Sequence, residues 1–362
     1  MKKFGILSWP ALSTKGGNPY NYILFSNIRN KAYPIHEFDF NIRNMLKYCL
    51  PFNYRIFHIH WPTHVLVGDS TFRTKVNLYA FFLFIRLIKA FGTRVVWTVH
   101  NLEAHESNFP ELQEKLDEFM YSNVDGFISL NKAGLDMIKK KAKNPGKQLF
   151  AHTFHPHYKS YYLNKISRKQ AREKLGVPEE KFVFLFLGQI RAYKNVTGLI
   201  KAYKEIKTPN AMLLIAGSVH RDIEAELYEQ LEQAENIIFI NSFIKDEELQ
   251  YYFKCADVVV TPYNRIFNSG SAFLNLSFDK PTLAPDLWAL SELKHTVGTR
   301  WIKTYEGALS AKNLESSMAE ILHESKDSAK VQPDISHLEP EVIALETINF
   351  YNSLLGVSTQ AT

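Results

Sequence analysis

A glycine followed six residues later by a lysine stands at the end of an apolar strand in the second half of the chain. The run Phe184–Leu187 ends at Gly188, and a short loop with two cations, Arg191 and Lys194, precedes a helical stretch that begins at Val196. Parallel α/β sheets bind ligands just outside the carboxyl ends of their strands. Two cations in such a loop favour an anionic ligand, and we expect a diphosphate. The alternative is an ordinary strand-to-helix turn with solvated charges.

A second candidate phosphate site follows the predicted strand Asp257–Thr261 and the turn at Tyr263. Ser269, Gly270 and Ser271 open the next predicted helix. Hydroxyl groups and unpaired backbone N–H groups at a helix N-terminus bind phosphates, although a serine N-cap with no ligand produces the same pattern. We expect this segment to face the cationic loop across neighbouring strand ends.

Glycines at two further strand ends are candidate ligand contacts. A pair of glycines ending in Gly17, within the segment Lys15–Pro19 that also contains Asn18, lies between the first predicted strand and the first predicted helix. A backbone without side chains can approach a ligand closely at such a place. Gly217 ends the strand Leu213–Ala216 and leaves room for a base or a ribose. Plain tight turns are the alternative at both positions.

Histidine and carboxylate side chains gather at strand ends in the first half of the chain. The strand Val95–Val99 ends at His100, and Glu103 and Glu106 follow closely. A strand-end histidine backed by carboxylates suits acid–base catalysis or the binding of sugar hydroxyls, whereas a buried structural histidine is the alternative. Another predicted strand end adds a polar and aromatic rim that consists of His58, His60 and Trp61.

Strands alternate with helices along the whole chain, which predicts doubly wound parallel sheets. A chain of 362 residues favours two domains. We expect a boundary within Ala151–Tyr158, and therefore domains at 1–158 and 159–340, followed by a last helix and tail at 341–362. Three histidines in the boundary segment suggest a metal site or a linker with solvated or cleft-lining side chains. The linker is favoured, because no Asp, Glu or Cys accompanies them.

The net charge of +6 is unevenly distributed. Residues 1–158 hold 20 Lys or Arg against 11 Asp or Glu, whereas residues 159–362 hold 23 against 26. The positive first half predicts an anionic partner. No nucleic-acid recognition motif is present, so an anionic membrane surface or a lipid diphosphate is the expected partner. The apolar segment Thr71–Phe91 with its basic flanks fits a helix in the membrane interface and equally an internal helix of the sheet.

The chain contains two cysteines, Cys49 and Cys255, which provide neither a disulfide framework nor a zinc-ligand spacing. This usage fits a reducing compartment, and we expect a cytoplasmic protein. The N-terminal apolar run is too short for a signal peptide, and it predicts a first strand instead. No stretch of about 18 uncharged apolar residues occurs, so no membrane-spanning helix is expected.

In this combination and order, the motifs resemble the GT-B-fold nucleotide-sugar glycosyltransferases, over nearly the whole chain. More narrowly, four strings resemble bacterial exopolysaccharide and capsule glycosyltransferases, in particular the xanthan-type β-mannosyltransferases that act on polyprenyl-diphosphate-linked oligosaccharides. These strings cover residues 58–62, 97–106, 155–158 and 188–195. The resemblance implies two Rossmann-like domains facing across a cleft, with a C-terminal helix that crosses back to the first domain. It also implies acceptor binding by the first domain and nucleotide-sugar binding by the second.

The resemblance also assigns roles to individual residues. The donor contacts implied are Gly17, Arg191, Lys194, Ser269, Gly270 and Ser271, with His100 at the donor sugar. We also expect donor contacts from Gly217 and Tyr263. The acceptor contacts are Asn18, His60 and Trp61, and the catalytic candidates are His100, Glu103 and Glu106. The paired glutamates of many retaining relatives are replaced here by Ile266 and Leu274, which favours an inverting transfer. No Asp-x-Asp motif occurs, so no metal or other cofactor is expected.

Three functions remain open on this sequence. The favoured one is transfer of a hexose from a GDP- or UDP-sugar to a soluble or lipid-diphosphate-linked saccharide, by a peripheral protein at the inner face of the cell membrane. A nucleotide-sugar epimerase with the same fold is the second, and it would need no acceptor. The third is a saccharide-binding protein without catalytic activity. Fold analogy alone does not separate them.

Overall fold

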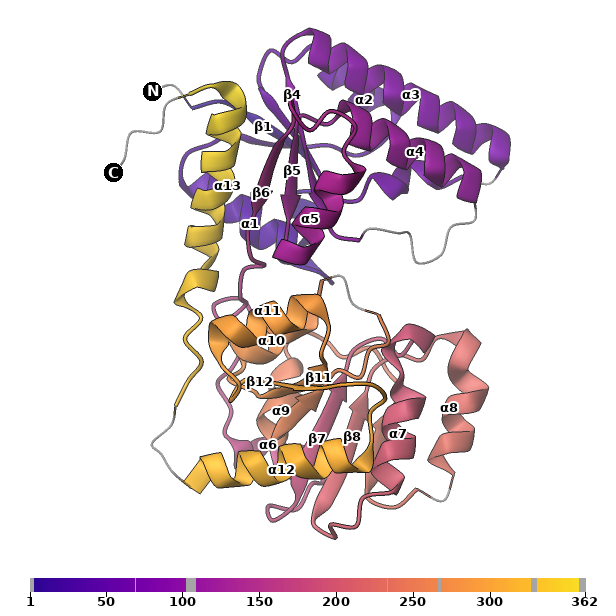
Figure 1. Cartoon of the computed structure of the whole chain (residues 1–362), viewed down its shortest axis with the longest axis vertical. Helices are drawn as coiled ribbons and strands as arrows, with labels where there is room; N and C mark the ends of the chain where they lie inside the picture. The colour runs from indigo at the N-terminus through magenta and orange to yellow at the C-terminus, as the bar shows by residue number, and fades with distance from the viewer. Residues whose placement is uncertain are drawn as a thin grey trace. The chain divides into compact units, whose positions relative to one another are not determined.

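The computed structural model describes residues 3–68, 70–101, 109–232, 234–265, 268–326 and 331–357. The chain forms two compact units, the first made of Met1–Pro156 with His337–Thr362 and the second of His157–Ser336. Each unit is built around a six-stranded sheet in which all paired strands are parallel (Figure 1). The predicted doubly wound fold, with a last helix that returns to the first unit, is confirmed.

The sheet of the first unit has the strand order β2-β1-β3-β4-β5-β6. Its strands are β1 (Ile6–Trp9), β2 (Ile35–Glu37), β3 (Ile56–Ile59), β4 (Arg94–Val99), β5 (Gly126–Ser129) and β6 (Leu149–His152). Its helices are α1 (Tyr20–Asn30), α2 (Ile42–Tyr48), α3 (Thr71–Ala90), α4 (Pro110–Asn123), α5 (Lys132–Lys141) and α13 (Pro340–Leu355), with short 3₁₀ turns η1 (Leu12–Lys15) and η2 (Pro62–Leu66).

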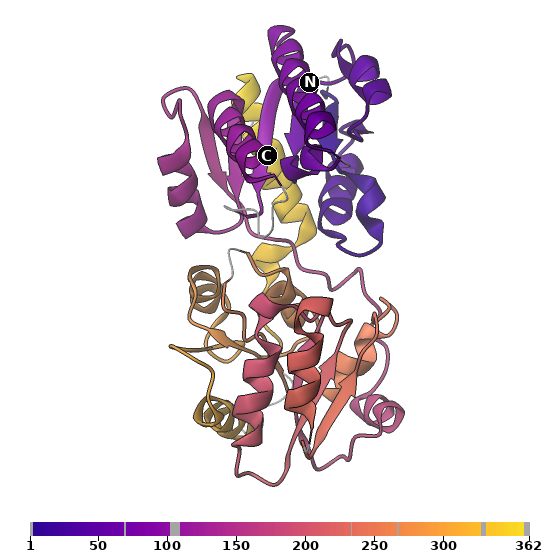
Figure 2. The same ribbon diagram turned by 90° about the vertical axis from the view of Figure 1, so that its right-hand side faces the viewer.

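Successive side chains of each strand point to opposite faces of this sheet, and the two faces pack against different layers of helices. Ile56 and Val96 pack with residues of α1 and α13, whereas Phe57 on the opposite face contacts Phe84 of α3 at a ring separation of 5.8 Å. Helix α13 lies beside α1 in both views (Figure 1, Figure 2). The last helix therefore completes the core of the first unit.

The second unit repeats the architecture, with the strand order β12-β11-β10-β7-β8-β9. Its strands are β7 (Phe182–Leu187), β8 (Ala211–Ala216), β9 (Ile237–Ile240), β10 (Val258–Val260), β11 (Thr282–Pro285) and β12 (Ile302–Tyr305). Its helices are α6 (Arg168–Leu175), α7 (Val196–Lys204), α8 (Glu224–Leu231), α9 (Leu249–Cys255), α10 (Gly270–Ser277), α11 (Trp288–Val297) and α12 (Ala311–Lys326). Three 3₁₀ turns are η3 (Ala192–Lys194), η4 (Arg221–Ile223) and η5 (Ser336–Leu338), of which η5 runs across the second boundary between the units.

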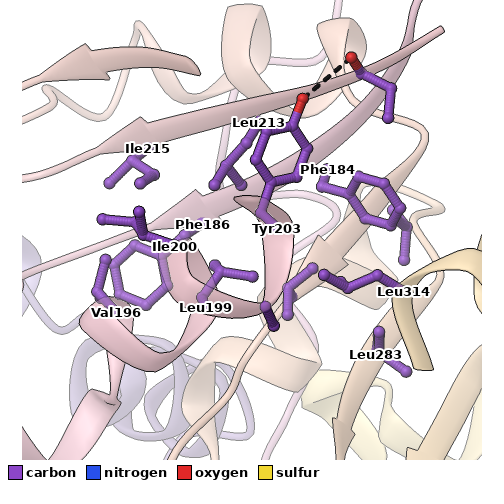
Figure 3. Packing of buried hydrophobic residues seen from close by; sticks show 14 of the residues in the cluster. Phe184, Phe186, Val196, Leu199, Ile200, Tyr203, Leu213, Ile215, Leu283 and Leu314 are labelled. Carbon is purple, nitrogen blue, oxygen red and sulfur yellow. Dashed lines mark hydrogen bonds between the residues drawn. The ribbon is translucent and has the colours of Figure 1, made fainter. Parts of the chain in front are cut away.

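Strand β7 shows the same alternation in the second unit. Phe184 and Phe186 pack with Leu199 and Ile200 of α7 (Figure 3), whereas Leu185 points into the opposite layer with residues of α6 and α9. A strand buried on both faces has an unbroken run of apolar residues, which is why the sequence predicts strands at β7 and β8.

One buried ion pair fixes the start of this sheet. Asp257, the residue before β10, accepts hydrogen bonds from the guanidinium of Arg172 at 2.9 Å and from the backbone N–H of Val183 at 2.8 Å. The Arg172 side chain is fully buried. Burying a charge without a partner is strongly unfavourable, so Asp257 has a structural role at the amino ends of β7 and β10.

Three short strands at the edges of the two sheets were not expected from the sequence: β2, β6 and β12. The interpretation of Ala151–Tyr158 as a linker is wrong at its start, because β6 extends to His152. Of the two alternatives for the histidines of this segment, the solvated one is wrong for His155 and His157, whose side chains are buried. No helix among the described residues has the length and apolar character needed to cross a bilayer.

Candidate active site

The cationic loop at the end of β7 holds its lysine against the strand end. Gly188 has φ +130°, and a Cβ placed there would lie 3.4 Å from the Lys194 Nζ. The turn η3 ends at Lys194, and the next residue, Asn195, caps the start of α7 in the left-handed conformation with φ 53°. The loop therefore folds back over the carboxyl end of β7, which is where the sequence predicts an anion.

The electrostatics of this loop favour a bound anion. Burial, and secondarily the charge of Arg191, lowers the pKa of Lys194 from 10.5 to about 8. Within the part of the chain that the structure describes, no carboxylate forms an ion pair with Lys194. Two cations that repel each other in a partly desolvated place are stabilised by a negative ligand. Diphosphate binding by this loop stays a prediction.

Tyr263 joins the cationic loop to the start of α10. Its ring centre lies 5.5 Å from the Lys194 Nζ, and its hydroxyl lies 3.1 Å from the Ser271 Oγ. The backbone N–H of Asn264 donates to the carbonyl of Tyr193 at 2.9 Å. The structure thus brings together Lys194, Tyr263 and Ser271, three residues that the sequence predicts as donor contacts. Tyr193 was not predicted, because nothing in its own sequence position distinguishes it from a packing aromatic.

The start of α10 is capped by its own serine. The Ser269 Oγ accepts from the backbone N–H of Ala272 at 3.3 Å, and the Ser269 side chain is buried. This N-cap is the structural alternative raised from the sequence. The capping hydrogen bond uses the Ser269 hydroxyl oxygen, whereas Gly270 and Ser271 are the first two residues of the helix. Phosphate binding by this segment stays a prediction.

Gly217 is required by backbone packing. A Cβ at this position would lie only 1.9 Å from the Gly188 carbonyl oxygen, and Gly217 has φ +151°. The backbone N–H of Ile190 donates to the carbonyl of Ser218 at 2.9 Å. The space where a side chain would stand is therefore filled by the Gly188 backbone. Gly217 holds the cationic loop in place, and a contact with a base or ribose stays a prediction.

In the first unit, four histidines and two large aromatic residues form a cluster at the carboxyl ends of β3 and β4. Its members are Tyr20, His58, His60, Trp61, His100 and His155. The His60 Nδ1 and the His100 Nε2 share a hydrogen bond of 3.0 Å. The His100 ring stacks on Trp61 with centroids 4.5 Å apart. The predicted rim and the predicted strand-end histidine therefore meet.

Burial keeps these histidines uncharged at neutral pH. Desolvation, followed by the charges of His155 and His58, lowers the pKa of His100 to about 3. Burial lowers the pKa of His155 to about 4 and that of His60 well below its usual value. A neutral imidazole with so low a pKa is a weak base at pH 7. The arrangement suits hydrogen bonding to hydroxyl groups better than proton abstraction.

His58 is not part of an exposed rim. It is fully buried, with Nδ1 2.6 Å from the Tyr351 hydroxyl and Nε2 2.7 Å from the Thr98 Oγ1. Both ring nitrogens are satisfied, so this histidine links β3 to β4 and to α13. The His60 Nε2, in contrast, is buried without a hydrogen-bond partner among the described residues.

The glycine loop of the first unit lies next to this cluster. Gly17 is exposed with φ +90°, and the Asn18 Oδ1 accepts from the backbone N–H of Tyr20 at 3.2 Å. Since Tyr20 contacts His100 at a ring separation of 5.2 Å, the loop and the histidines share one edge of the sheet. His155 joins through Tyr20 at 4.6 Å, a contact that only the folded chain reveals.

Two predicted catalytic residues, Glu103 and Glu106, lie outside the described residues. The same is true of Ile266, whereas Leu274 packs against the layer formed by α6 and α9. Among the described residues, no group of three His, Cys, Asp or Glu side chains is arranged to hold a metal ion. Metal independence stays a prediction.

Solved structures with this arrangement have the GT-B fold. Sucrose-phosphate synthase from Thermosynechococcus elongatus superimposes with a TM-score of 0.69 at 13% identity, covering 98% of this chain and 100% of that one. Anabaena HepE in complex with UDP and glucose gives a TM-score of 0.66 at 14% identity, with the same coverage. Two six-stranded parallel sheets and a returning last helix thus define a GT-B protein.

Sequence comparison identifies the class of enzyme. Residues 167–272 match the family model described as glycosyl transferases group 1. The GDP-mannose:glycolipid 4-beta-D-mannosyltransferase of Xanthomonas campestris pv. campestris is 25% identical over 321 residues, which are 88% of this chain and 83% of that protein. The chain is a glycosyltransferase of the GT-B fold, and the predicted resemblance is confirmed.

Proposed function

We propose that this glycosyltransferase moves a hexose from a GDP- or UDP-sugar to a saccharide carried on a lipid diphosphate, in the biosynthesis of an exopolysaccharide, capsule or related glycan. The observation that carries the proposal is the partly buried Lys194, which stands beside Arg191 at the carboxyl end of β7. The similar mannosyltransferase acts on a GDP-sugar and a glycolipid, as its name states. The similar HepE structure is a complex with UDP and glucose. The two comparisons therefore differ in the nucleotide base, and the donor base is tested below.

In the proposed reaction, Lys194 and Arg191 stabilise the nucleoside diphosphate as it leaves the sugar. Cations fixed in advance at a developing negative charge lower the barrier most when water is excluded. The contact of Lys194 with the Tyr263 ring and the Tyr263–Ser271 hydrogen bond hold the lysine and the helix start in one geometry. A diphosphate in this place would receive charge from the loop and hydrogen bonds from the start of α10.

The histidine cluster of the first unit is proposed to bind sugar hydroxyls. Burial lowers the pKa of His100 to about 3, which makes His100 a poor general base. The acceptor hydroxyl must nevertheless lose a proton, and a carboxylate suits that task better. We therefore assign the base to Glu103 or Glu106, which follow His100 in sequence, and we assign acceptor contacts to Trp61, His60 and Asn18.

Inversion at the anomeric carbon is the proposed stereochemical course. Leu274 packs in an apolar layer and offers no carboxylate to the sugar or the ribose. An α-linked donor should then give a β-linked product. The one-bond carbon–proton coupling at the new anomeric centre distinguishes the two anomers for a manno-configured sugar, and an α-linked product would contradict the proposal.

A lipid-linked acceptor requires the enzyme to work at a bilayer. We propose a peripheral protein at the cytoplasmic face of the cell membrane, supported by the positive first half of the chain and by the glycolipid substrate of the similar mannosyltransferase.

A donor panel tests the proposal. Purified protein is incubated with GDP- and UDP-hexoses, with and without a polyprenyl-diphosphate oligosaccharide, and nucleoside diphosphate release is measured. Transfer predicts release that depends strongly on the acceptor. A nucleotide-sugar epimerase would instead convert the donor sugar without acceptor. A binding protein without catalytic activity would release no diphosphate with any pair.

A further inference from the structure

Helix α3 exposes an apolar face although its other face is buried. Leu78, Phe81 and Ile85 pack into the first unit. The opposite face carries large apolar side chains that are between 39% and 78% exposed, namely Phe72, Val76, Tyr79, Leu83 and Leu87. The two alternatives raised from the sequence for Thr71–Phe91 thus describe two faces of one helix.

The exposed residues form a continuous stripe. Their spacings of four, three, four and four residues keep them on one side of an α-helix, because each turn takes about 3.6 residues. Eleven of the twenty large apolar side chains that stand exposed in the described part of the chain lie between Ile42 and Phe91. Concentration of such residues on one surface marks an interaction site, whereas single exposed ones are ordinary.

Basic side chains border the stripe. Lys75 and Arg86 lie on one edge and Arg73 on the other, as the helical periodicity places them, and all three are exposed. Helix α3 contains four Lys or Arg and no Asp or Glu. Residues 42–91 hold seven Lys or Arg against one Asp. The excess of this segment alone equals the net charge of +6 of the whole chain.

The stripe begins close to the predicted acceptor residues. Helix α3 follows η2, which starts directly after Trp61. A series of ring contacts leads from Trp61 to His64 at 6.4 Å, from His64 to Trp9 at 6.2 Å, and from Trp9 to Phe81 of α3 at 5.8 Å. Both views show α3 on the outside of the first unit (Figure 1, Figure 2). A surface in contact with this stripe would lie near the histidine cluster.

We propose that the exposed face of α3 docks the protein onto an anionic lipid bilayer. The five apolar side chains enter the boundary between headgroups and acyl chains, and Lys75, Arg73 and Arg86 contact anionic headgroups. Apolar residues with basic borders are the chemistry of helices that lie in the membrane interface. A second copy of the chain fits less well, because a two-fold contact would bring two basic borders together.

Vesicle sedimentation with the full chain tests the docking surface. The probes are neutral phosphatidylcholine vesicles and vesicles in which about a third of the lipid is phosphatidylglycerol. Wild-type protein should bind the anionic vesicles at least about tenfold more tightly, and about 0.5 M salt should weaken that binding. No donor or acceptor is needed, so the outcome is independent of the proposed transfer reaction.

Two substitutions on α3 and a matched control locate the contact. Leu83→Glu should weaken vesicle binding about tenfold or more, since it removes one inserted leucine and adds a negative charge. Lys75→Gln should weaken binding to anionic vesicles about fivefold and leave binding to neutral vesicles unchanged. Leu322→Glu on α12, at a position 44% exposed, should bind vesicles like wild type. The three variants should keep the wild-type thermal midpoint and nucleoside diphosphate affinity.

Equal vesicle binding by Leu83→Glu and Leu322→Glu would overturn the proposal, as would failure of wild-type protein to bind anionic vesicles. Sedimentation velocity examines the competing partner. A wild-type dimer that Leu83→Glu converts to a monomer would also refute membrane docking and assign the stripe to self-association.

Discussion

Replacing Lys194 by methionine should remove most of the turnover and at the same time stabilise the unliganded protein. The lysine is partly buried next to Arg191 and forms no ion pair among the described residues. Methionine retains the unbranched apolar stem of lysine and removes the charge. Without a bound diphosphate, the buried charge therefore lowers the stability of the folded protein. With a bound diphosphate, the same charge holds the ligand.

The magnitude follows from the pKa of Lys194. Burial lowers this pKa from 10.5 to about 8, and each pH unit corresponds to about 1.4 kcal/mol, so the charged form is disfavoured by on the order of 3 kcal/mol. Because the folded state releases its proton first, this destabilisation is complete below pH 8 and disappears as the pH rises from 8 towards 10.5. Loss of one charge-assisted contact at the departing diphosphate should lower kcat about a hundredfold or more.

Urea unfolding and donor turnover, measured on the same preparations, check both effects. At pH 7 the unfolding midpoint of Lys194→Met should exceed that of wild type, and the difference should shrink at pH 9.5. Lys201→Met is the control, because Lys201 is exposed on α7, where substitutions usually change stability by about 0.5 kcal/mol or less. Wild-type donor affinity should decline above pH 8, where Lys194 loses its proton. Lys194→Arg should retain activity and show no such decline. A less stable Lys194→Met, or one that turns over at wild-type rate with saturating donor, would refute this reasoning.

Three further predictions concern the site and the fold. Activity should survive excess EDTA, and complete loss that manganese or magnesium restores would show that the loop cations do not carry the diphosphate charge alone. Gly217→Ala should lower the free energy of unfolding by about 2 kcal/mol or more and weaken donor binding, since the new Cβ would lie 1.9 Å from the Gly188 carbonyl oxygen. Thermal unfolding measures the loss of stability, and nucleotide titration measures the loss of affinity. Tyr351→Phe should lower the free energy of unfolding by about 1–3 kcal/mol, because it leaves the buried His58 Nδ1 without its hydrogen-bond partner. Chemical denaturation measures this change, and an unchanged unfolding midpoint would show that the bond does not contribute to stability.

The central strands of the fold were predictable because burial on both faces leaves a clear apolar signal. Strands β7 and β8 are examples, with every residue of β8 buried. Strands β2 and β9 at the sheet edges are partly exposed; β9 keeps the apolar run Ile237–Ile240, whereas β2 has three residues, two of them polar, and gives no such signal. Strand β6 is also short and partly exposed, and its last two residues fell within the segment Ala151–Tyr158 that was interpreted as a linker.

The donor loop was predictable for a different reason. Gly188, Arg191 and Lys194 are close in sequence, and the end of an apolar strand fixes where such a loop must lie. The histidine cluster draws instead on residues from β3, β4, α1 and the segment after β6. His155 and Tyr20 meet through a tertiary contact of 4.6 Å, for which no local pattern exists. The low basicity of His100 likewise depends on burial that the sequence does not display.

The path of the chain through the two units sets an order in which they can fold during synthesis. Residues 157–336 form one unbroken unit, so this unit is complete as soon as its last helix leaves the ribosome. The first unit begins earlier and finishes later, because Ile348 and Tyr351 of α13 belong to its core. Until translation reaches residue 355, the apolar surface of α1 and β3 lacks its cover. The amino-terminal unit is therefore the last to close, and a chain truncated before α13 would expose that surface to chaperones and proteases.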